Sequence, residues 1–257
     1  MRGDILKKKL MVLCAVAIMI STCLTGCKMN SGKIRFGSAG IGGTYQIFGD
    51  TFANLISSKS KKYNIEVKTT AGSAANLRLL SKDYIQMAVA QMDLINDAYN
   101  RTGIFENDKK YQGYRAVASL YTEACQIVVP ADSDIQSMDD LEGKKVCIGE
   151  EESGTEQNAL QILNAYGLNE RLVDTVNLNY TDAAKKLKSG DIDAFFCTAG
   201  VQTTVINELS KQCKIRLVSL DQKGVSRLKK SYKFYTEYTI PAGTYVNQTK
   251  EIKTVGV

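Results

Sequence analysis

Short turns rich in glycine, serine and threonine follow apolar strands at three places, and these turns hold the residue types best suited to bind a small anion. The first turn, 37–45, reads GSAGIGGTY and leads into a helix. Such a turn leaves backbone N–H groups unpaired at a helix start, which favours a carboxylate or phosphate. One turn alone indicates only a tight corner, but the same order recurs in 145–163 and 193–209. Three such turns predict a binding cleft.

The carboxyl ends of the strands, where ligands of open α/β sheets bind, supply the candidate contacts. One wall is predicted to contain Gly40, Gly42, Gly43, Thr44, Tyr45, Gly72, Ser73 and Asn76. The facing wall is predicted to contain Ser153, Gly154, Thr155, Ala199 and Gly200. Backbone amides and hydroxyls can hold a carboxylate without arginine, since each charge-assisted hydrogen bond contributes roughly 1.5 to 3 kcal/mol.

Two carboxylates end neighbouring strand segments and are candidates to hold a ligand ammonium group. They are Asp93 and Glu123, with Gln91 and Gln126 close in sequence. If they line the cleft, an amino acid is the natural ligand. Asp93 has an alternative role as the cap of the helix that follows it. Glu123 has no such alternative and is the stronger candidate.

Several kinds of chemistry are excluded by residues that the sequence lacks. The chain has no histidine, which rules out Ser-His and Cys-His nucleophiles and histidine-ligated zinc. It has no C-x-x-C motif, and neither a dinucleotide fingerprint nor a P-loop is complete in the turn 37–45. Only carboxylate, lysine, tyrosine or cysteine chemistry is left for an enzyme. We expect no metal and no cofactor, and a binding protein in place of an enzyme. An exported hydrolase that uses Asp93 and Glu123 as acid and base is the alternative.

The first 26 residues have the pattern of an export signal. Three lysines, 7–9, precede the apolar run 10–20, which is too short for a comfortable membrane span, and Leu-Thr-Gly-Cys ends at Cys27. This sequence resembles a bacterial lipobox, which implies cleavage before Cys27, lipidation of Cys27 and an extracytoplasmic, membrane-anchored protein. Residues 27–33 are then a tether. An uncleaved anchor or a plain signal peptide is the alternative.

The charge and the remaining cysteines complete this outline. Removing residues 1–26 takes away four basic residues and one acidic residue, so the formal charge falls from +6 to +3, which gives little support for nucleic-acid binding. Cys125, Cys147, Cys197 and Cys213 remain. An exported protein can form disulfides, with Cys147 and Cys197 the first pair to test, but their apolar surroundings favour buried thiols.

Strand and helix patterns alternate along most of the chain, which predicts an α/β fold with mainly parallel sheets. Strands are expected at 34–37, 63–73, 85–93, 145–148, 173–178, 192–197 and 215–221. Helices are expected from 44, 74, 155, 182, 201 and 225. Two extended segments within 114–133 meet near Glu123, as a hinge between two lobes requires. The predicted division is a first lobe at 34–123, a second lobe at 124–230 and a segment returning to the first lobe at 231–257.

The order of several motifs resembles the TAXI family of TRAP-transporter solute-binding proteins. The motifs include GSAGIGGTYQIFGDTFANLI, TAGSAANLRLLSKDYIQMAVAQMD, LEGKKVCIGEEESGTEQNALQIL and GDIDAFFCTAG, and the match runs from about Ile34 to the last residue. The resemblance implies a type II periplasmic-binding-protein fold with two α/β lobes around a ligand cleft. It also implies a small organic acid or amino acid such as glutamate as ligand, and delivery to a TRAP permease.

Two features depart from that family pattern. Relatives generally continue beyond the counterpart of KTVGV (253–257), so we expect a chain truncated in its first lobe. Relatives often carry histidine where Gln126 stands. A truncated surface lipoprotein that binds no solute is therefore a further alternative to the receptor.

Overall fold

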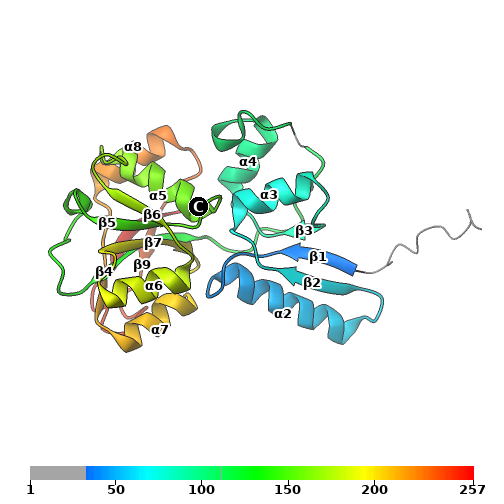
Figure 1. Cartoon of the computed structure of the whole chain (residues 1–257), viewed down its shortest axis with the longest axis horizontal. Helices are drawn as coiled ribbons and strands as arrows, with labels where there is room; N and C mark the ends of the chain where they lie inside the picture. Colours follow the sequence, from blue (N-terminus) through cyan, green and yellow to red (C-terminus); the bar gives the residue numbers. More distant parts are fainter. Residues whose placement is uncertain (1–32, 111) are drawn as a thin grey trace, which may run out of the picture. The chain divides into compact units, whose positions relative to one another are not determined.

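Two β-sheets organise the residues that the computed structural model describes, which are 33–110 and 112–257. Residues 34–257 form one unit, in which a three-stranded sheet and a seven-stranded sheet each carry their own helices (Figure 1). We call these two α/β layers the small lobe and the large lobe. The predicted signal 1–26, Cys27 and the tether up to residue 32 lie outside the described residues.

The small lobe has the strand order β2-β1-β3, with β1 and β3 parallel. Its elements are β1 (Lys33–Gly37), α2 (Thr44–Lys59), β2 (Asn64–Lys68), α3 (Ser73–Ser81), β3 (Met87–Ala88), α4 (Met92–Asn100) and the short helix η1 (Gly103–Phe105). Helix α2 covers one face of the sheet and α3 and α4 cover the other (Figure 1). Each face has its own apolar cluster, around Phe36 and Ile65 below and around Leu77 and Leu94 above.

The large lobe has the strand order β6-β5-β7-β4-β10-β9, and β8 pairs with β4. Its strands are β4 (Ala124–Pro130), β5 (Lys145–Gly149), β6 (Asp174–Asn177), β7 (Ala194–Ala199), β8 (Ile215–Leu217), β9 (Thr236–Ile240) and β10 (Ile252–Gly256). Its helices are η2 (Asp139–Leu141), α5 (Gly154–Ala165), α6 (Tyr180–Ser189), α7 (Thr204–Gln212) and α8 (Gln222–Ser231). The sheet is mixed, since β5 is parallel to β6 and β7 whereas β4 is antiparallel to β7, β8 and β10.

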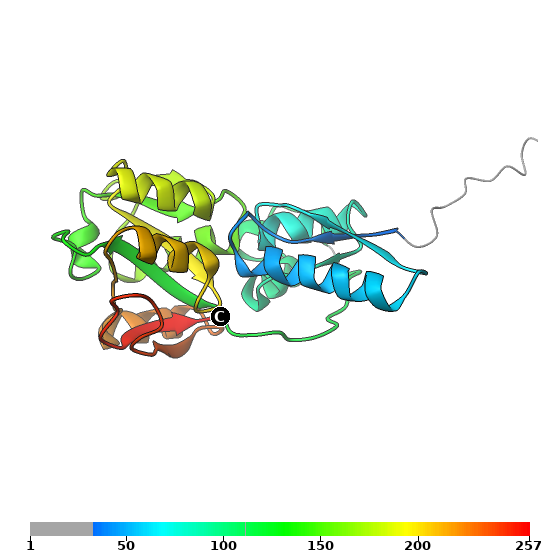
Figure 2. The same ribbon diagram turned by 90° about the horizontal axis from the view of Figure 1, so that it is seen from below.

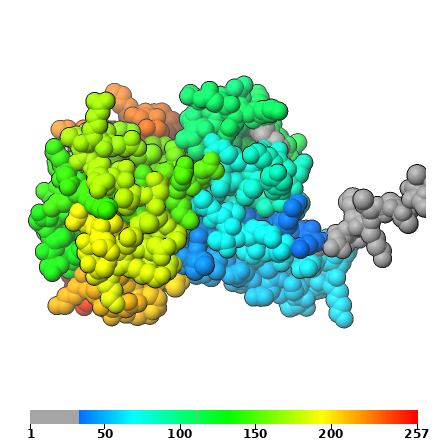
Figure 3. Space-filling model, in the orientation of Figure 1, coloured from blue at the N-terminus to red at the C-terminus, as the bar shows by residue number. Residues whose placement is uncertain are grey.

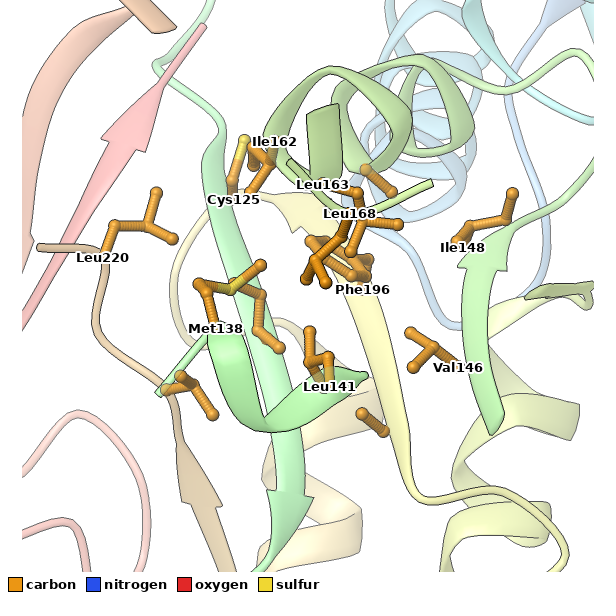
Figure 4. Packing of buried hydrophobic residues seen from close by; sticks show 14 of the residues in the cluster. Cys125, Met138, Leu141, Val146, Ile148, Ile162, Leu163, Leu168, Phe196 and Leu220 are labelled. Carbon is orange, nitrogen blue, oxygen red and sulfur yellow. The ribbon is translucent and has the colours of Figure 1, made fainter. Parts of the chain in front are cut away.

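The two faces of the large sheet support two cores, because side chains alternate between faces along a strand. On β4, Cys125 and Ile127 point to the core under α5 and α8, and Val128 points to the core over α6 and α7. Phe196 packs in the first core, near Leu163 of α5 and Leu168, as Figure 4 shows. Every residue of β4 from Ala124 to Val129 is buried, so this strand is the centre of the lobe.

The connection between the lobes differs from the predicted pair of long strands. Only the second half of 114–133 is a strand, β4, and residues 113–123 have no regular structure. Figure 2 shows this stretch running apart from both sheets. Its residues 115–120 are all exposed, with Val117 85% exposed. Residues 113–122 have the sequence pattern of an extended segment, but they pair with no other strand among the described residues.

The last segment also differs from the prediction. The sequence predicts that 231–257 returns to the first lobe, but β9 and β10 pair with each other and β10 pairs with β4 in the large sheet. Val257 and Glu123 exchange two backbone hydrogen bonds of 3.0 Å, which extends this ladder to the start of β4. Strand β10 places Val255 in the core under α5 and α8 and packs Ile252 against the core over α6 and α7, so both of its faces are apolar where it joins the sheet. The boundaries predicted for the first lobe, 34–123, and for the second lobe, 124–230, stay predictions.

The four cysteines among the described residues are free thiols. Cys125, Cys147 and Cys197 are buried in the large lobe, and Cys213 is half-buried. Burial raises the pKa of Cys125 to about 12 and also raises the pKa of Cys147. These thiols act as small apolar side chains, and the Cys147–Cys197 bridge is not formed.

Candidate functional site

A cleft lies where the turns of the two lobes face each other. Its empty volume is about 460 Å³ including the opening to solvent, within the range of small-molecule sites, and its enclosed part has room for only a few waters. A Cβ atom added at Gly72 would lie 3.5 Å from Ser153, and one at Gly43 would lie 3.3 Å from the Tyr180 ring. The corners of the two lobes therefore point toward one another. The lining residues are Ala39, Gly40, Gly43, Thr44, Tyr45, Ala71, Gly72, Ser73, Gln91, Glu123, Glu150, Ser153, Gly154, Thr155, Leu178, Asn179, Tyr180, Thr198 and Ala199.

Four helices begin at this cleft. Helices α2 and α3 start after Gly43 and Gly72, and neither of these glycines provides a side-chain cap. Helices α5 and α6 start after Ser153 and Asn179, whose side chains accept hydrogen bonds from Glu156 N and Asp182 N. The first backbone N–H groups of these helices have no carbonyl partner within a helix, and the dipoles add positive potential at the same place. The cleft wall is therefore suited to a carboxylate.

The floor of the cleft holds a carboxylate of its own. Glu123 is 6% exposed, and it accepts hydrogen bonds from Tyr45 Oη at 2.9 Å and from Tyr121 Oη at 3.5 Å. Burial raises its pKa to about 7, although the hydrogen bonds from Tyr45 and Gln91 oppose that rise. Among the described lining residues there is no lysine or arginine to pair with it. A cationic group on the solute would supply the missing partner.

A second carboxylate, Glu150, lines the opposite side of the cleft. It is near Gly40, where an added Cβ would lie 2.6 Å from Glu150 Oε2. Desolvation raises its pKa above the ordinary value, with a smaller contribution from Asp182. Two carboxylates without a cation make the interior of the cleft unfavourable for a solute that carries only negative charge.

The lobes also touch outside the cleft. Arg78 of α3 donates to Glu152 Oε1 at 2.7 Å and to Asp108 Oδ2 at 3.0 Å, and Ala75 N donates to Glu152 O at 3.2 Å. Thr181 Oγ1 donates to Ile41 O at 3.0 Å on the other side. In Figure 3 atoms of residues near 150 lie against those of α3. The cleft is therefore in a closed arrangement, with direct contacts on both sides.

Most of the predicted contact residues lie at the cleft, and whether they touch a ligand stays a prediction. Twelve line it: Gly40, Gly43, Thr44, Tyr45, Gly72, Ser73, Gln91, Glu123, Ser153, Gly154, Thr155 and Ala199. Gly42 and Gly200 do not line it. Gly42 instead has a positive φ of 90°, and its carbonyl accepts a hydrogen bond from Thr203 Oγ1 of the large lobe at 3.4 Å. Gly200 lies against Tyr121.

Asn76 does not line the cleft either, because it holds the small lobe together. It is completely buried, donates to Ser38 O at 2.7 Å and to Val89 O at 2.9 Å, and accepts from Thr70 Oγ1 at 2.8 Å. These bonds join the ends of β1 and β3 to α3. Asn76 therefore has a structural role. An asparagine near the start of a helix is compatible with a structural role and with ligand binding, so the sequence alone does not distinguish the two.

Replacing Asn76 by alanine is expected to lower the free energy of unfolding by about 3 kcal/mol, since buried carbonyl groups lose their donors. Chemical denaturation followed by circular dichroism measures this loss. Asn100→Ala, at an exposed site on α4, is the matched control and should stay within about 0.5 kcal/mol of the unmodified protein. Equal stability of the two variants would contradict the structural role.

Asp93 lies behind the cleft wall and does not line it. It is 7% exposed and accepts from Leu94 N at 2.8 Å and from Asn158 Nδ2 at 3.2 Å. Desolvation raises its pKa to about 6, against the effect of these bonds. The predicted acid and base pair of a hydrolase requires both carboxylates in the cleft, and of the two only Glu123 lines it.

Seven lining residues are not among the predicted contacts: Ala39, Ala71, Glu150, Leu178, Asn179, Tyr180 and Thr198. Asn179 and Tyr180 carry the clearest signal available in the sequence. Asn179 precedes a helical pattern and stands three residues before Asp182, as an N-cap does. Tyr180 Oη contacts Thr155 Oγ1 at 2.5 Å and donates to Thr198 O at 2.9 Å, which ties three turns of the large lobe together.

Residues 36–257 match the sequence profile of the NMT1-like family, which covers most of the chain. The chain belongs to the NMT1-like family. The members of that family are periplasmic solute-binding proteins. The type II periplasmic-binding-protein fold predicted from the sequence is confirmed by its solved neighbours.

Three solved structures illustrate the similarity. A protein of Bordetella bronchiseptica RB50 has a TM-score of 0.55 and 20% identity, over 77% of this chain and 59% of its own. The ligand-binding component of an ABC-type import system from Staphylococcus aureus, with zinc bound, has a TM-score of 0.50 and 12% identity, over 88% and 66%. The periplasmic aliphatic sulphonate binding protein SsuA of Escherichia coli has a TM-score of 0.45 and 17% identity, over 72% and 56%. The aligned part of this chain thus spans little more than half of that protein. At these identities the likeness concerns the fold alone.

Two further features of the described residues bear on the site. Within 33–110 and 112–257, no helix combines the length and the apolar character needed to cross a bilayer. In the same ranges, no three carboxylate or cysteine side chains are grouped so that they could hold a metal ion.

Proposed function

We propose that this chain is the extracytoplasmic receptor for a small amino acid or related zwitterion, which it delivers to a membrane permease. The observation that carries the proposal is Glu123, a buried carboxylate without a cationic partner among the residues that line a cleft between two lobes. The N-terminal ends of four helices surround the same space. A zwitterion satisfies both features, since its ammonium pairs with Glu123 and its carboxylate meets the helix starts.

A solute with only negative charge fits the helix N-termini but is repelled by the carboxylate of Glu123. Its carboxylate would meet the same backbone amides, but Glu123 and Glu150 would remain unpaired or would have to stay protonated. Glutamate-like amino acids, which the TAXI resemblance implies, meet the requirement. Aliphatic sulphonates, the class named for SsuA of Escherichia coli, lack the ammonium group that would pair with Glu123.

For the membrane partner we propose a permease of the TRAP type, and for the anchor a lipid on Cys27. Support for both comes from the sequence, from the motif order between Ile34 and Val257 and from the lipobox-like Leu-Thr-Gly-Cys. The ABC-type system named for the Staphylococcus aureus neighbour is the competing class. Uptake into vesicles that carry the cognate permease separates the two. An imposed ion gradient without ATP should drive uptake, and a requirement for ATP hydrolysis would assign the chain to an ABC system.

Thermal unfolding of the purified protein tests the solute. The panel contains L-amino acids, dicarboxylates without an amine, and alkanesulfonates. A solute at one hundred times its Kd should add about 2.7 kcal/mol of stability, because it binds only the folded chain. We expect the shift with at least one amino acid. A cooperative melt that no member of the panel moves would instead favour a chain that binds no solute.

A further inference from the structure

A line of hydrogen bonds leads from the first turn of α4 to the cleft and fixes which atom of the Gln91 amide faces the cleft. It begins at Leu94 N, which can only donate and which bonds to Asp93 Oδ1 at 2.8 Å. The other carboxylate oxygen, Asp93 Oδ2, accepts from Asn158 Nδ2 at 3.2 Å. The amide nitrogen of Asn158 also donates to Tyr235 Oη at 2.9 Å, and Tyr235 Oη donates to Gln161 Oε1 at 2.7 Å. Asn158 is therefore held with its nitrogen toward Asp93.

The next bond carries this polarity to the cleft. With its nitrogen committed to Asp93, Asn158 turns its oxygen to Gln91, and Gln91 Nε2 donates to it at 3.1 Å. Gln91 Oε1 then has to lie on the other side of the amide. It is a buried oxygen that has no hydrogen-bond donor among the described residues, and the Gln91 side chain lines the cleft opposite Gly154. A buried acceptor without a donor costs free energy until something supplies one.

We infer that Gln91 is a specificity-determining residue whose side-chain oxygen accepts an N–H of the solute, and that Asp93 and Asn158 are positioning residues that keep this oxygen turned to the cleft. The inference rests on the proposed function and deepens it. Gln91 and Glu123 line the same cleft, so the solute amine meets two acceptors, one neutral and one charged. Neither Asp93 nor Asn158 lines the cleft, so both act through Gln91.

Asp93→Asn should reverse the polarity of the whole line. Leu94 N still needs an acceptor, so the new amide turns its oxygen to Leu94 and its nitrogen to Asn158. Asn158 must then flip, for which Tyr235 Oη turns its hydrogen from Gln161 to the new oxygen, and Gln91 flips with it and gives up its hydrogen bond to Glu123. The cleft now presents an N–H in place of the oxygen, facing the solute amine.

The readout is the ratio of two affinities, measured by calorimetry at pH 8 for an amino acid and for the same acid with hydrogen in place of the amine. The probes are L-alanine with propionate, L-aspartate with succinate, and L-glutamate with glutarate. The pair with the tightest-binding amino member is carried forward. For Asp93→Asn we expect the preference for the amino member to fall by about 10- to 100-fold, the effect of losing a hydrogen bond to a charged group. Gln91→Met should lower it to a similar extent.

Two further variants separate this role from loss of a charge or of packing. Asp97→Asn removes a carboxylate from the same helix outside the line of bonds and should leave the ratio unchanged. Asp93→Asn combined with Asn158→Asp restores the order of donors and acceptors. The new amide at position 93 then donates to the new carboxylate at position 158, and that carboxylate accepts from Gln91. This double variant should recover most of the preference for the amino member.

Each outcome bears on one claim. A folded Asp93→Asn protein with the ratio of the unmodified chain, or a double variant that recovers nothing, overturns the role assigned to Gln91, Asn158 and Asp93. Absence of binding by every pair to the unmodified protein overturns the proposed function itself, which is a separate result. A single cooperative melt for each variant shows that the comparison is made on folded protein.

Discussion

Replacing Glu123 by glutamine is expected to weaken the binding of an amine-bearing solute by roughly 30- to 100-fold at pH 8. Glutamine keeps the size of the side chain and can still accept the hydrogen bond that Tyr45 donates. It removes the buried negative charge that pairs with the ammonium group, and a hydrogen bond to a charged partner contributes roughly 1.5 to 3 kcal/mol. Calorimetric titration of the unmodified and Glu123→Gln proteins with the same amino acid measures the loss.

The same substitution should change how stability depends on pH in the absence of solute. Burial raises the pKa of Glu123 from 4.5 to about 7, so between these values the folded chain holds a proton that the unfolded chain releases. Stability is therefore lost as the pH rises from about 4.5 to 7. Glu123→Gln removes this dependence and should be more stable than the unmodified protein above about pH 7, by an amount on the order of 3 kcal/mol, with no gain below about pH 4.5.

Glu150→Gln is the matched control for both measurements. Glu150 lines the same cleft and its pKa is raised by a smaller desolvation, but it has no tyrosine donor and lies on the opposite wall. We expect a small change in affinity and in the pH profile. An amino acid that binds Glu123→Gln as tightly as it binds the unmodified protein would contradict the pairing of its ammonium with Glu123.

Replacing Gly154 by alanine should weaken solute binding by about 5- to 150-fold without unfolding the protein. Gly154 is the first residue of α5 and has no positive φ, so alanine suits the helix itself. Across the cleft, however, the new methyl group would overlap the side chain of Gln91, which is held by Asn158. Overpacking of this kind costs about 1 to 3 kcal/mol, and here the cost falls only on the closed arrangement.

Small-angle scattering with and without the amino acid shows whether the Gly154→Ala protein closes. The unmodified chain should become more compact when the solute is added, and the variant should respond only at higher concentration. Adding Gln91→Ala makes room for the methyl group, so closure should return even though a solute contact is lost. Normal closure of Gly154→Ala alone would show that the two lobes do not meet at this residue when solute is bound.

The sequence predicts the positions of the cleft turns better than it predicts the roles of single polar residues. Glycines and small hydroxyl residues after apolar strands mark the corners at Gly43, Gly72 and Ser153, because few other residues allow such tight turns. Asn76 and Asp93 have the same local pattern as binding residues. Their side chains turn inward, toward Ser38 and Asn158, and those partners are distant in sequence.

The pairing of strands does not follow from the sequence pattern either. The apolar run of β4 indicates a buried strand, but nothing in its composition shows that β7, β8 and β10 all lie antiparallel to it. The sequence predicts two long strands that meet near Glu123. Residues 113–122 are not paired with another strand in the described structure, since strand formation requires a partner as well as a propensity.

Native mass spectrometry of the protein, purified without denaturation, tests the central claim most directly. We expect a bound solute that carries both an amine and a carboxylate and that is released unchanged. We also expect this solute to be absent from Glu123→Gln protein prepared in the same way. Recovery of a solute without an amine, retained equally by both proteins, would contradict the role of Glu123 as the partner of a solute ammonium group.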